Sequence, residues 1–130
     1  MSQTFRAAII TPEAVALDTD VTQVQFPAHD GQVGILKHRA PLLAKLGTGV
    51  LRLDTTGGEQ RYLVAGGYAE MKADKLTILT SEAVPAANIT AQTISAEEQK
   101  LAGITGTDAA AIEKRQKQQA RVQAMRMLVS

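Results

Sequence analysis

Cysteine is absent from this chain of 130 residues, and aromatic residues are scarce, with two Phe, two Tyr and no Trp. The absence of Cys excludes a disulfide framework, a thiolate zinc site and a cysteine nucleophile, and it suits a reducing compartment. Few aromatic rings leave little for stacking on nucleobases. The formal net charge of +1 is not the basic excess usual in proteins that bind nucleic acids or membrane surfaces. We therefore expect no nucleic-acid partner and a core made mainly of Val, Ile, Leu and Ala.

Long apolar runs are also missing. None approaches the roughly 18 residues that a membrane span requires. The first residues, MSQTFRAAIITPE, have neither the basic start and apolar core of a secretory signal nor the Arg and Ser content of a transit peptide. We expect a soluble chain without a targeting segment.

Residues 1–85 alternate apolar and polar side chains with a period of two, which is typical of strands with one buried face. Phe5, Ala7 and Ile9 fall on one side of their segment, as do Val24 and Phe26 of theirs. Turn formers recur about every ten residues, and two of them, DTTGG (54–58) and KADK (72–75), predict hairpins. No helical periodicity interrupts this half. The pattern predicts an antiparallel β-sandwich.

The composition changes after Pro85 to helix formers, so residues 86–130 are predicted as a second unit. Ser95 with Glu98 three residues later forms the pattern of a capping box, which predicts that the first helix begins at Ser95. Gly103 or Gly106 is expected to end it. A helix from Ser95 to Ala102 spans barely two turns.

A second helix is predicted to start after Thr107 or Asp108 and to run for about 20 residues, which makes an αα-hairpin with the first. Its charges are almost all basic, with Glu113 as the single acid. Its apolar stripe is modest, so we expect the hairpin to dock weakly on the sandwich. The basic face is compatible with a solvated surface or with an acidic protein partner.

The sequence contains no strong pattern of catalytic, metal-binding or phosphate-binding residues. His29 and His38 have no further His or Cys to complete a metal site. No serine lies in a nucleophile-elbow pattern. Gly66 and Gly67 lack the lysine and helix of a phosphate-binding loop, so close strand packing or a bulge is the better interpretation. No catalytic residue, metal or cofactor is predicted.

Two segments together resemble one family. FPAHDGQVGILKHRAPLL (26–43) and, about twenty residues later, YLVAGGYAEMKADKLTILTSEA, followed by a helical tail, are similar to the epsilon subunit of the bacterial F-type ATP synthase. The residues that match the family pattern are Asp30, Gly31, Val33, Gly34, Ala40, Pro41, Leu42, Leu43, Gly66 and Gly67. Order, spacing and layout agree over nearly the whole chain.

The resemblance implies a fold of about ten strands in an N-terminal β-sandwich, carrying a C-terminal two-helix hairpin. It implies a non-catalytic subunit of the central rotor that binds the gamma subunit and the ring of c subunits, and so couples proton transport to ATP synthesis. The hairpin is expected to reach the alpha and beta subunits of the catalytic head and restrain ATP hydrolysis. The location implied is the cytoplasmic face of a bacterial membrane, through the complex.

The resemblance also implies residue roles. Gln32, Val33, His38 and Arg39 are the candidates for contact with the c ring or gamma, whereas Asp30, Gly31, Gly34 and Pro41 shape the loops. Arg115, Arg121 and Arg126 are the candidates for inhibitory contact with acidic groups of the catalytic head.

Two departures from the family pattern limit these assignments. His38-Arg39 replaces the usual Gly-His pair, so the histidine is displaced by one position. In NITAQTI, Thr90 and Thr93 stand where the family's ATP-binding motif has Asp and Arg, so ATP binding is not predicted. A free-standing β-sandwich that binds another protein remains the alternative function.

Overall fold

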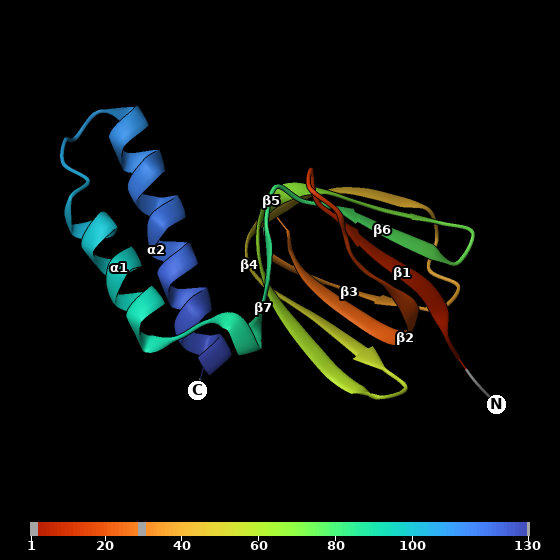
Figure 1. The fold of residues 1–130 in the computed structure, drawn as a ribbon. Coiled ribbons are helices and arrows are strands. Elements are labelled where there is room, and N and C mark those ends of the chain that lie inside the picture. Colours follow the sequence, from red (N-terminus) through yellow and green to blue (C-terminus); the bar gives the residue numbers. More distant parts are fainter. Residues whose placement is uncertain (1–2, 29–30, 130) are drawn as a thin grey trace.

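The structure, a computed structural model, describes residues 3–28 and 31–129. Figure 1 shows a β-sandwich with two helices packed along one flank. The elements are β1 (Phe5–Ile10), β2 (Val15–Ala28), β3 (Gly31–Leu36), β4 (Leu42–Thr55), β5 (Gly58–Lys72), β6 (Lys75–Leu79), β7 (Ala83–Pro85), the 3-10 turn η1 (Ala86–Asn88), α1 (Ala91–Ala102) and α2 (Ala109–Val129).

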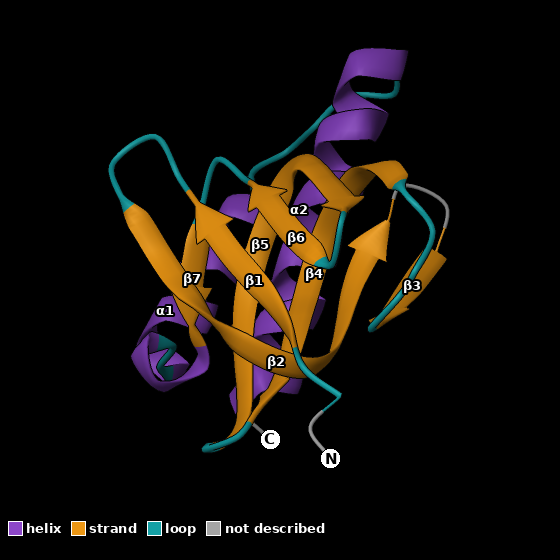
Figure 2. Ribbon diagram, turned by 90° about the vertical axis from the view of Figure 1, so that its right-hand side faces the viewer, coloured by secondary structure: helices purple, strands orange, loops and turns teal. Residues whose placement is uncertain are grey.

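The strands close on themselves. Their order is β1-β6-β5-β4-β2-β3, β7 pairs with β5, and β1 also pairs with β2. Strands β1, β6, β5, β4 and β2 therefore form a ring, with β3 at its edge (Figure 2). A ring with an odd number of strands cannot be antiparallel throughout, and the β1–β6 pair is parallel. The predicted sandwich is confirmed in outline, with barrel-like closure and one parallel pair that the sequence pattern did not predict.

The strand number differs from the expected ten. Seven strands are present in the described part of the chain. The reason is that β2, β4 and β5 have 14, 14 and 15 residues and continue from one layer into the other. For example, β5 pairs with β7 through residues 62–64 and with β6 through residues 68–72.

The core is aliphatic, as predicted. Phe5, Ala7 and Ile9 are buried, and Val24 and Phe26 are fully buried on β2. They pack with the inward side chains of β4, β5 and β6 in one cluster. The alternation of apolar and polar residues therefore predicted the inward faces of β1 and β2 correctly.

Both predicted hairpin turns are confirmed. Thr55 pairs with Gly58 across the first, where Gly58 has a φ of 128°. In the second, Ala73 and Asp74 have φ values of 51° and 58°, as a two-residue turn between right-twisted strands requires.

Gly67 permits a close approach between β5 and β6. Its φ is 116°, and a Cβ atom there would lie 1.9 Å from the carbonyl oxygen of Leu79. Glycine is thus required for packing and conformation, which confirms the interpretation of this residue as structural.

The first helix begins earlier than predicted. Thr90 is its N-cap and accepts a hydrogen bond from the Thr93 N–H at 3.2 Å, so the predicted cap at Ser95 is wrong. Ser95 lies inside α1, which has 12 residues rather than two turns. Thr90 and Ser95 are both residue types suited to an N-cap, and the helix begins at the earlier of the two.

The other helix boundaries agree with the sequence. Gly103 is the C-cap of α1 and donates its backbone N–H to Gln99 O at 3.1 Å. α2 has 21 residues and begins directly after Asp108, whose carbonyl accepts from the Ile112 N–H. The predicted two-helix hairpin is confirmed.

Candidate partner-binding surfaces

The first surface surrounds the start of β3. Gln32 is exposed and Val33 half-buried, and they pair with Pro27 and Phe26 of β2. Both line a groove of about 580 Å³, which is also lined by Arg52, Glu59, Arg61 and Met127. Gly31 has a φ of 140°, consistent with its predicted role in loop shape. His29 and Asp30, and hence the predicted role of Asp30, lie outside the described residues.

The second surface is the loop after β3. His38 is exposed, has a φ of 67°, and donates its backbone N–H to Asp74 Oδ1 at 2.8 Å. Its Nδ1 lies 3.3 Å from Asp74 Oδ2. The loop is therefore fixed to the β5–β6 turn. Arg39 is exposed and donates its backbone N–H to Leu36 O.

The four predicted contact residues do not form one patch. Gln32 and Leu36 are separated along β3 by about 13 Å of extended chain, and His38 and Arg39 follow beyond Leu36. A partner that touches both pairs must span that strand. Gly34, which was predicted to shape the loop, instead lies within β3 and pairs with Gln25 of β2. Pro41 is exposed directly before β4.

Sequence reasoning missed a third surface on the outer face of the sheet. Tyr68 and Leu79 are 53% and 49% exposed and face each other across β5 and β6. Leu43 is 70% exposed and lies diagonally opposite Tyr68, next to the Lys45–Tyr68 pair. The alternation of each strand contained the signal, because these three apolar residues occupy outward positions where polar residues are expected.

The predicted arginines of the hairpin lie apart from one another, and each has a partner within the chain. Arg115 donates to Ile104 O and Gly106 O at the helix connection. Arg126 forms an ion pair with Glu98 of α1. These two arginines hold the hairpin together rather than face outward as a group.

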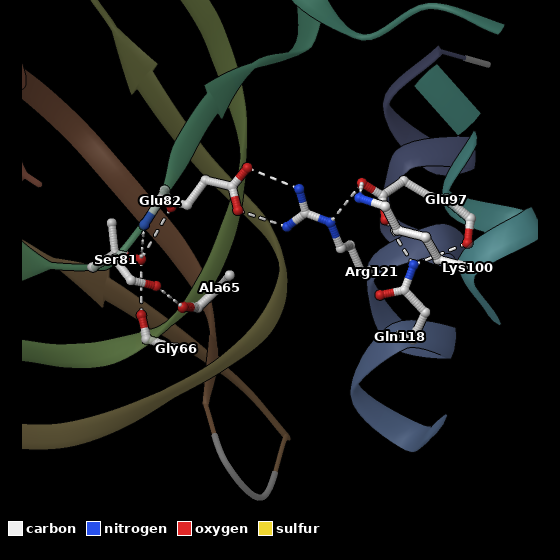
Figure 3. A network of polar contacts seen from close by, with 9 residues as sticks. Ala65, Gly66, Ser81, Glu82, Glu97, Lys100, Gln118 and Arg121 are labelled. Carbon is white, nitrogen blue, oxygen red and sulfur yellow. Dashed lines mark hydrogen bonds and ion pairs between the residues drawn. The ribbon is translucent and has the colours of Figure 1, made fainter. Parts of the chain in front are cut away.

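Arg121 has a different environment (Figure 3). Its guanidinium donates two hydrogen bonds to Glu82, at 2.7 and 2.8 Å, and its Nε lies 3.4 Å from Glu97 Oε1. The hydrogen bonds to Glu82 raise the pKa of Arg121, which stays charged. Sequence reasoning did not find Glu82, because it is 39 residues away and carries no motif.

Glu97 is buried on the α1 side of this network. Gln118 donates to its backbone carbonyl at 2.9 Å and to its carboxylate at 2.7 Å. Burial by itself raises the pKa of Glu97, but the hydrogen bond from Gln118 and the charges of Arg121 and Lys100 outweigh burial and lower it. The carboxylate is therefore held ionised.

No group of three or more His, Asp or Glu residues suited to hold a metal ion occurs among residues 3–28 and 31–129. Thr90 and Thr93, at the family's nucleotide-motif positions, have their hydroxyls 3.0 Å apart at the start of α1. Within the same described ranges, no helix is long and apolar enough to cross a membrane.

Comparison with known proteins gives the family. Residues 4–86 match the model of the ATP synthase delta/epsilon chain, beta-sandwich domain. The epsilon chain of Rhodopirellula baltica is 42% identical over 81 residues, which are 62% of this chain and 63% of that relative. The chloroplastic epsilon chain of Cyanidioschyzon merolae is 40% identical over 127 residues, which are 93% of this chain and 97% of that relative. The chain belongs to the ATP synthase delta/epsilon family.

The family model ends just after β7, whereas the alignment with the algal epsilon chain also spans most of the helical part. A chain of the Euglena gracilis mitochondrial ATP synthase has the same fold, with a TM-score of 0.84 at 19% identity, covering 100% of this chain and 84% of that one. An epsilon chain is a non-catalytic subunit, so residues of these surfaces are to be understood as contacts and not as reacting groups.

Proposed function

We propose that this chain is the epsilon subunit in the central stalk of an F-type ATP synthase, where it joins the gamma subunit to the c ring and couples proton transport to ATP synthesis. The observation that carries the proposal is the identity of 40% to an epsilon chain over 93% of this chain. The structural neighbour from Euglena supports it, since it comes from an assembly described as OSCP, F1 and c-ring.

The β-ring suits a part that transmits torque. Strands β1, β6, β5, β4 and β2 each have a partner on both sides, which hinders sliding, and the aliphatic core that they enclose resists deformation. Gln32 and Val33 lie near the start of the edge strand β3, and His38 and Arg39 lie in the loop after it. We assign these four residues to contact with the c ring and gamma. The complex thereby attaches the chain to the cytoplasmic face of the membrane.

We further propose that residues 1–85 are the rotor-binding unit and residues 86–130 a regulatory unit that reaches the alpha and beta subunits of the catalytic head. Arg115, Arg121 and Arg126 are its candidates for inhibitory contact. Replacing all three by Ala in the assembled enzyme should raise ATP hydrolysis. Unchanged hydrolysis would remove this assignment.

The decisive experiment is a pull-down of the tagged full-length chain from detergent-solubilised membranes of its own source. Recovery of gamma and c subunits supports the rotor role, and their absence would favour a free-standing binding module. Gln32→Asp should reduce recovery of the c ring with the fold intact. Gln119→Asp, which changes an exposed glutamine of α2 in the same way, is the matched control and should leave recovery unchanged.

A further inference from the structure

A cleft lies between the first half of α2 and the strands β4 and β5, on the flank of the sandwich where the helices pack (Figure 1). Its volume is about 490 Å³, within the roughly 300–1,000 Å³ of most ligand pockets. It adjoins a smaller hollow of about 240 Å³, and Thr48, Gly66 and Lys117 line both. We call the two hollows together the lysine cleft.

The charges of the lysine cleft are mostly positive. Lys45 of β4 lines its larger hollow, Lys114 of α2 lines the smaller one, and Lys117 lines both. Glu113 is the one carboxylate among the described lining residues, and its Oε1 lies 3.3 Å from the Lys117 Nζ. Neither Lys45 nor Lys114 forms an ion pair within residues 3–28 and 31–129. The cleft therefore favours an anion.

The sandwich side of the lysine cleft provides uncharged groups. The pairing of β4 with β5 skips Gly47 and Gly66, which do not pair with each other. A Cβ atom at Gly66 would meet nothing within 4 Å, so a ligand has room to approach the backbone there. The Thr48 hydroxyl has no hydrogen-bond partner among the described residues. It is therefore available to donate to a ligand oxygen.

The fold supplies at Gly66 what the neighbouring sequence lacks. A phosphate-binding loop combines accessible glycine backbone with a lysine and a hydroxyl side chain. No lysine stands at the required position near Gly66 in the sequence, but α2 brings Lys114 and Lys117 to the same hollow. Lysine binds phosphate as a point charge and needs no fixed fork geometry.

We propose that the lysine cleft binds an oxyanion of the phosphate type, either the inorganic ion or the phosphate group of a small organic molecule. Lys114 and Lys117 neutralise the charge from the side of α2, and Thr48 donates to an oxygen from the side of the sandwich. Thr90 and Thr93 do not line the cleft, so the site is separate from the positions of the family's nucleotide motif. The site is a property of the isolated chain and does not rest on the proposed function.

Two substitutions should weaken binding. Lys117→Gln removes a charge that both hollows share and should raise the dissociation constant for phosphate about tenfold. Thr48→Val removes the hydroxyl with little change in shape and should raise it about threefold to tenfold. Lys72→Gln is the matched control, because it makes the same change of charge at an exposed lysine of β5 that does not line the cleft. It should leave the dissociation constant unchanged.

Glu113→Gln should have the opposite effect. The Glu113 carboxylate repels an anion and competes with it for Lys117, so the neutral amide should lower the dissociation constant about threefold. This gain in affinity cannot result from a loss of the fold. It therefore decides the proposal even if Lys117→Gln or Thr48→Val disturbs the structure.

The test is a titration of the purified full-length chain with sodium phosphate, followed by amide NMR at an ionic strength held constant with sodium chloride. The expected result is a saturable shift of the Thr48, Gly66 and Lys117 amides, with Ile9 of the core unchanged. Equal shifts with chloride alone would overturn the proposal. An equal loss of affinity in Lys72→Gln, or weaker binding in Glu113→Gln, would overturn it as well.

Two further probes distinguish the sources of the anion. Glycerol phosphate that binds more tightly than inorganic phosphate assigns the cleft to phosphorylated small molecules, and weaker binding assigns it to the inorganic ion. A glutamate-rich peptide that shifts the same amides at lower concentration than either would overturn the proposal in favour of an acidic protein partner. Because no synthase subunit is present, these outcomes are independent of the pull-down.

Discussion

Gly67→Ala should be among the most damaging single substitutions in the sandwich. A Cβ atom there would lie 1.9 Å from Leu79 O, whereas most real contacts exceed 3.4 Å, so β6 must move by about 1.5 Å. The φ of 116° adds backbone strain of about 1–3 kcal/mol for any residue with a Cβ atom. The shift also disturbs the Tyr68–Leu79 pairing, whose hydrogen bonds contribute about 0.5–1.5 kcal/mol each. We expect a loss of about 3–5 kcal/mol in the free energy of unfolding.

The neighbouring glycine provides the control. Gly66 has a φ of 72°, and a Cβ atom there would meet nothing within 4 Å. Gly66→Ala should therefore cost only the left-handed conformation, about 1–2 kcal/mol. Urea unfolding followed by far-UV circular dichroism measures both variants. Equal losses would refute the steric reasoning, since the two substitutions differ in the contact with Leu79 and hardly in chemistry.

Three further predictions concern the hairpin. Thr90→Ala should destabilise the start of α1 by about 1 kcal/mol, because the N-cap hydrogen bond to Thr93 is lost, and amide exchange of residues 91–94 checks this. Met125→Ala should cost about 2–4 kcal/mol at the hairpin interface, since the side chain is fully buried there, and unchanged exchange protection of α2 would contradict it. Because the pKa of Glu97 is lowered in the fold, its stabilising effect is complete above its ordinary value of 4.5 and is lost as pH falls through the lowered value. Glu97→Gln should remove that acid-dependent loss of hairpin protection, and a native-like pH profile would exclude this role.

The sequence predicted the local features well because their causes are local. The DTTGG and KADK turns, Gly103 as a helix end and the inward face of β1 depend on residues within a few positions of one another. The strand number could not be obtained this way. Whether β5 continues past Gly66 and Gly67 depends on partners on both sides, β4 and β6, that hold the chain extended there.

For the candidate sites too, the local pattern could be predicted from the sequence, whereas the long-range partners could not. The arginines of α2 were visible as a basic run, but their partners were not. Glu82 and Glu98 lie 39 and 28 residues from the arginines that bind them, and only the fold brings them together. The exposed row of Leu43, Tyr68 and Leu79 was also missed. Alternation within each strand places these residues outward, but only the strand register brings them side by side.

The two parts of the chain meet opposite physical requirements. The apolar residues of the ring form one continuous cluster, to which every long strand contributes. Displacing any of these strands exposes much of the core, so deformation of the ring is costly. Within residues 3–28 and 31–129, the hairpin rests on a smaller separate cluster and one charged pair, so its separation exposes less apolar surface than the loss of a core strand. Cooperative unfolding of the ring should therefore occur at higher free energy than release of the hairpin. The proposed role, in which the sandwich transmits torque and the hairpin changes its regulatory state, needs both properties, and the separation of the two apolar clusters is suited to it.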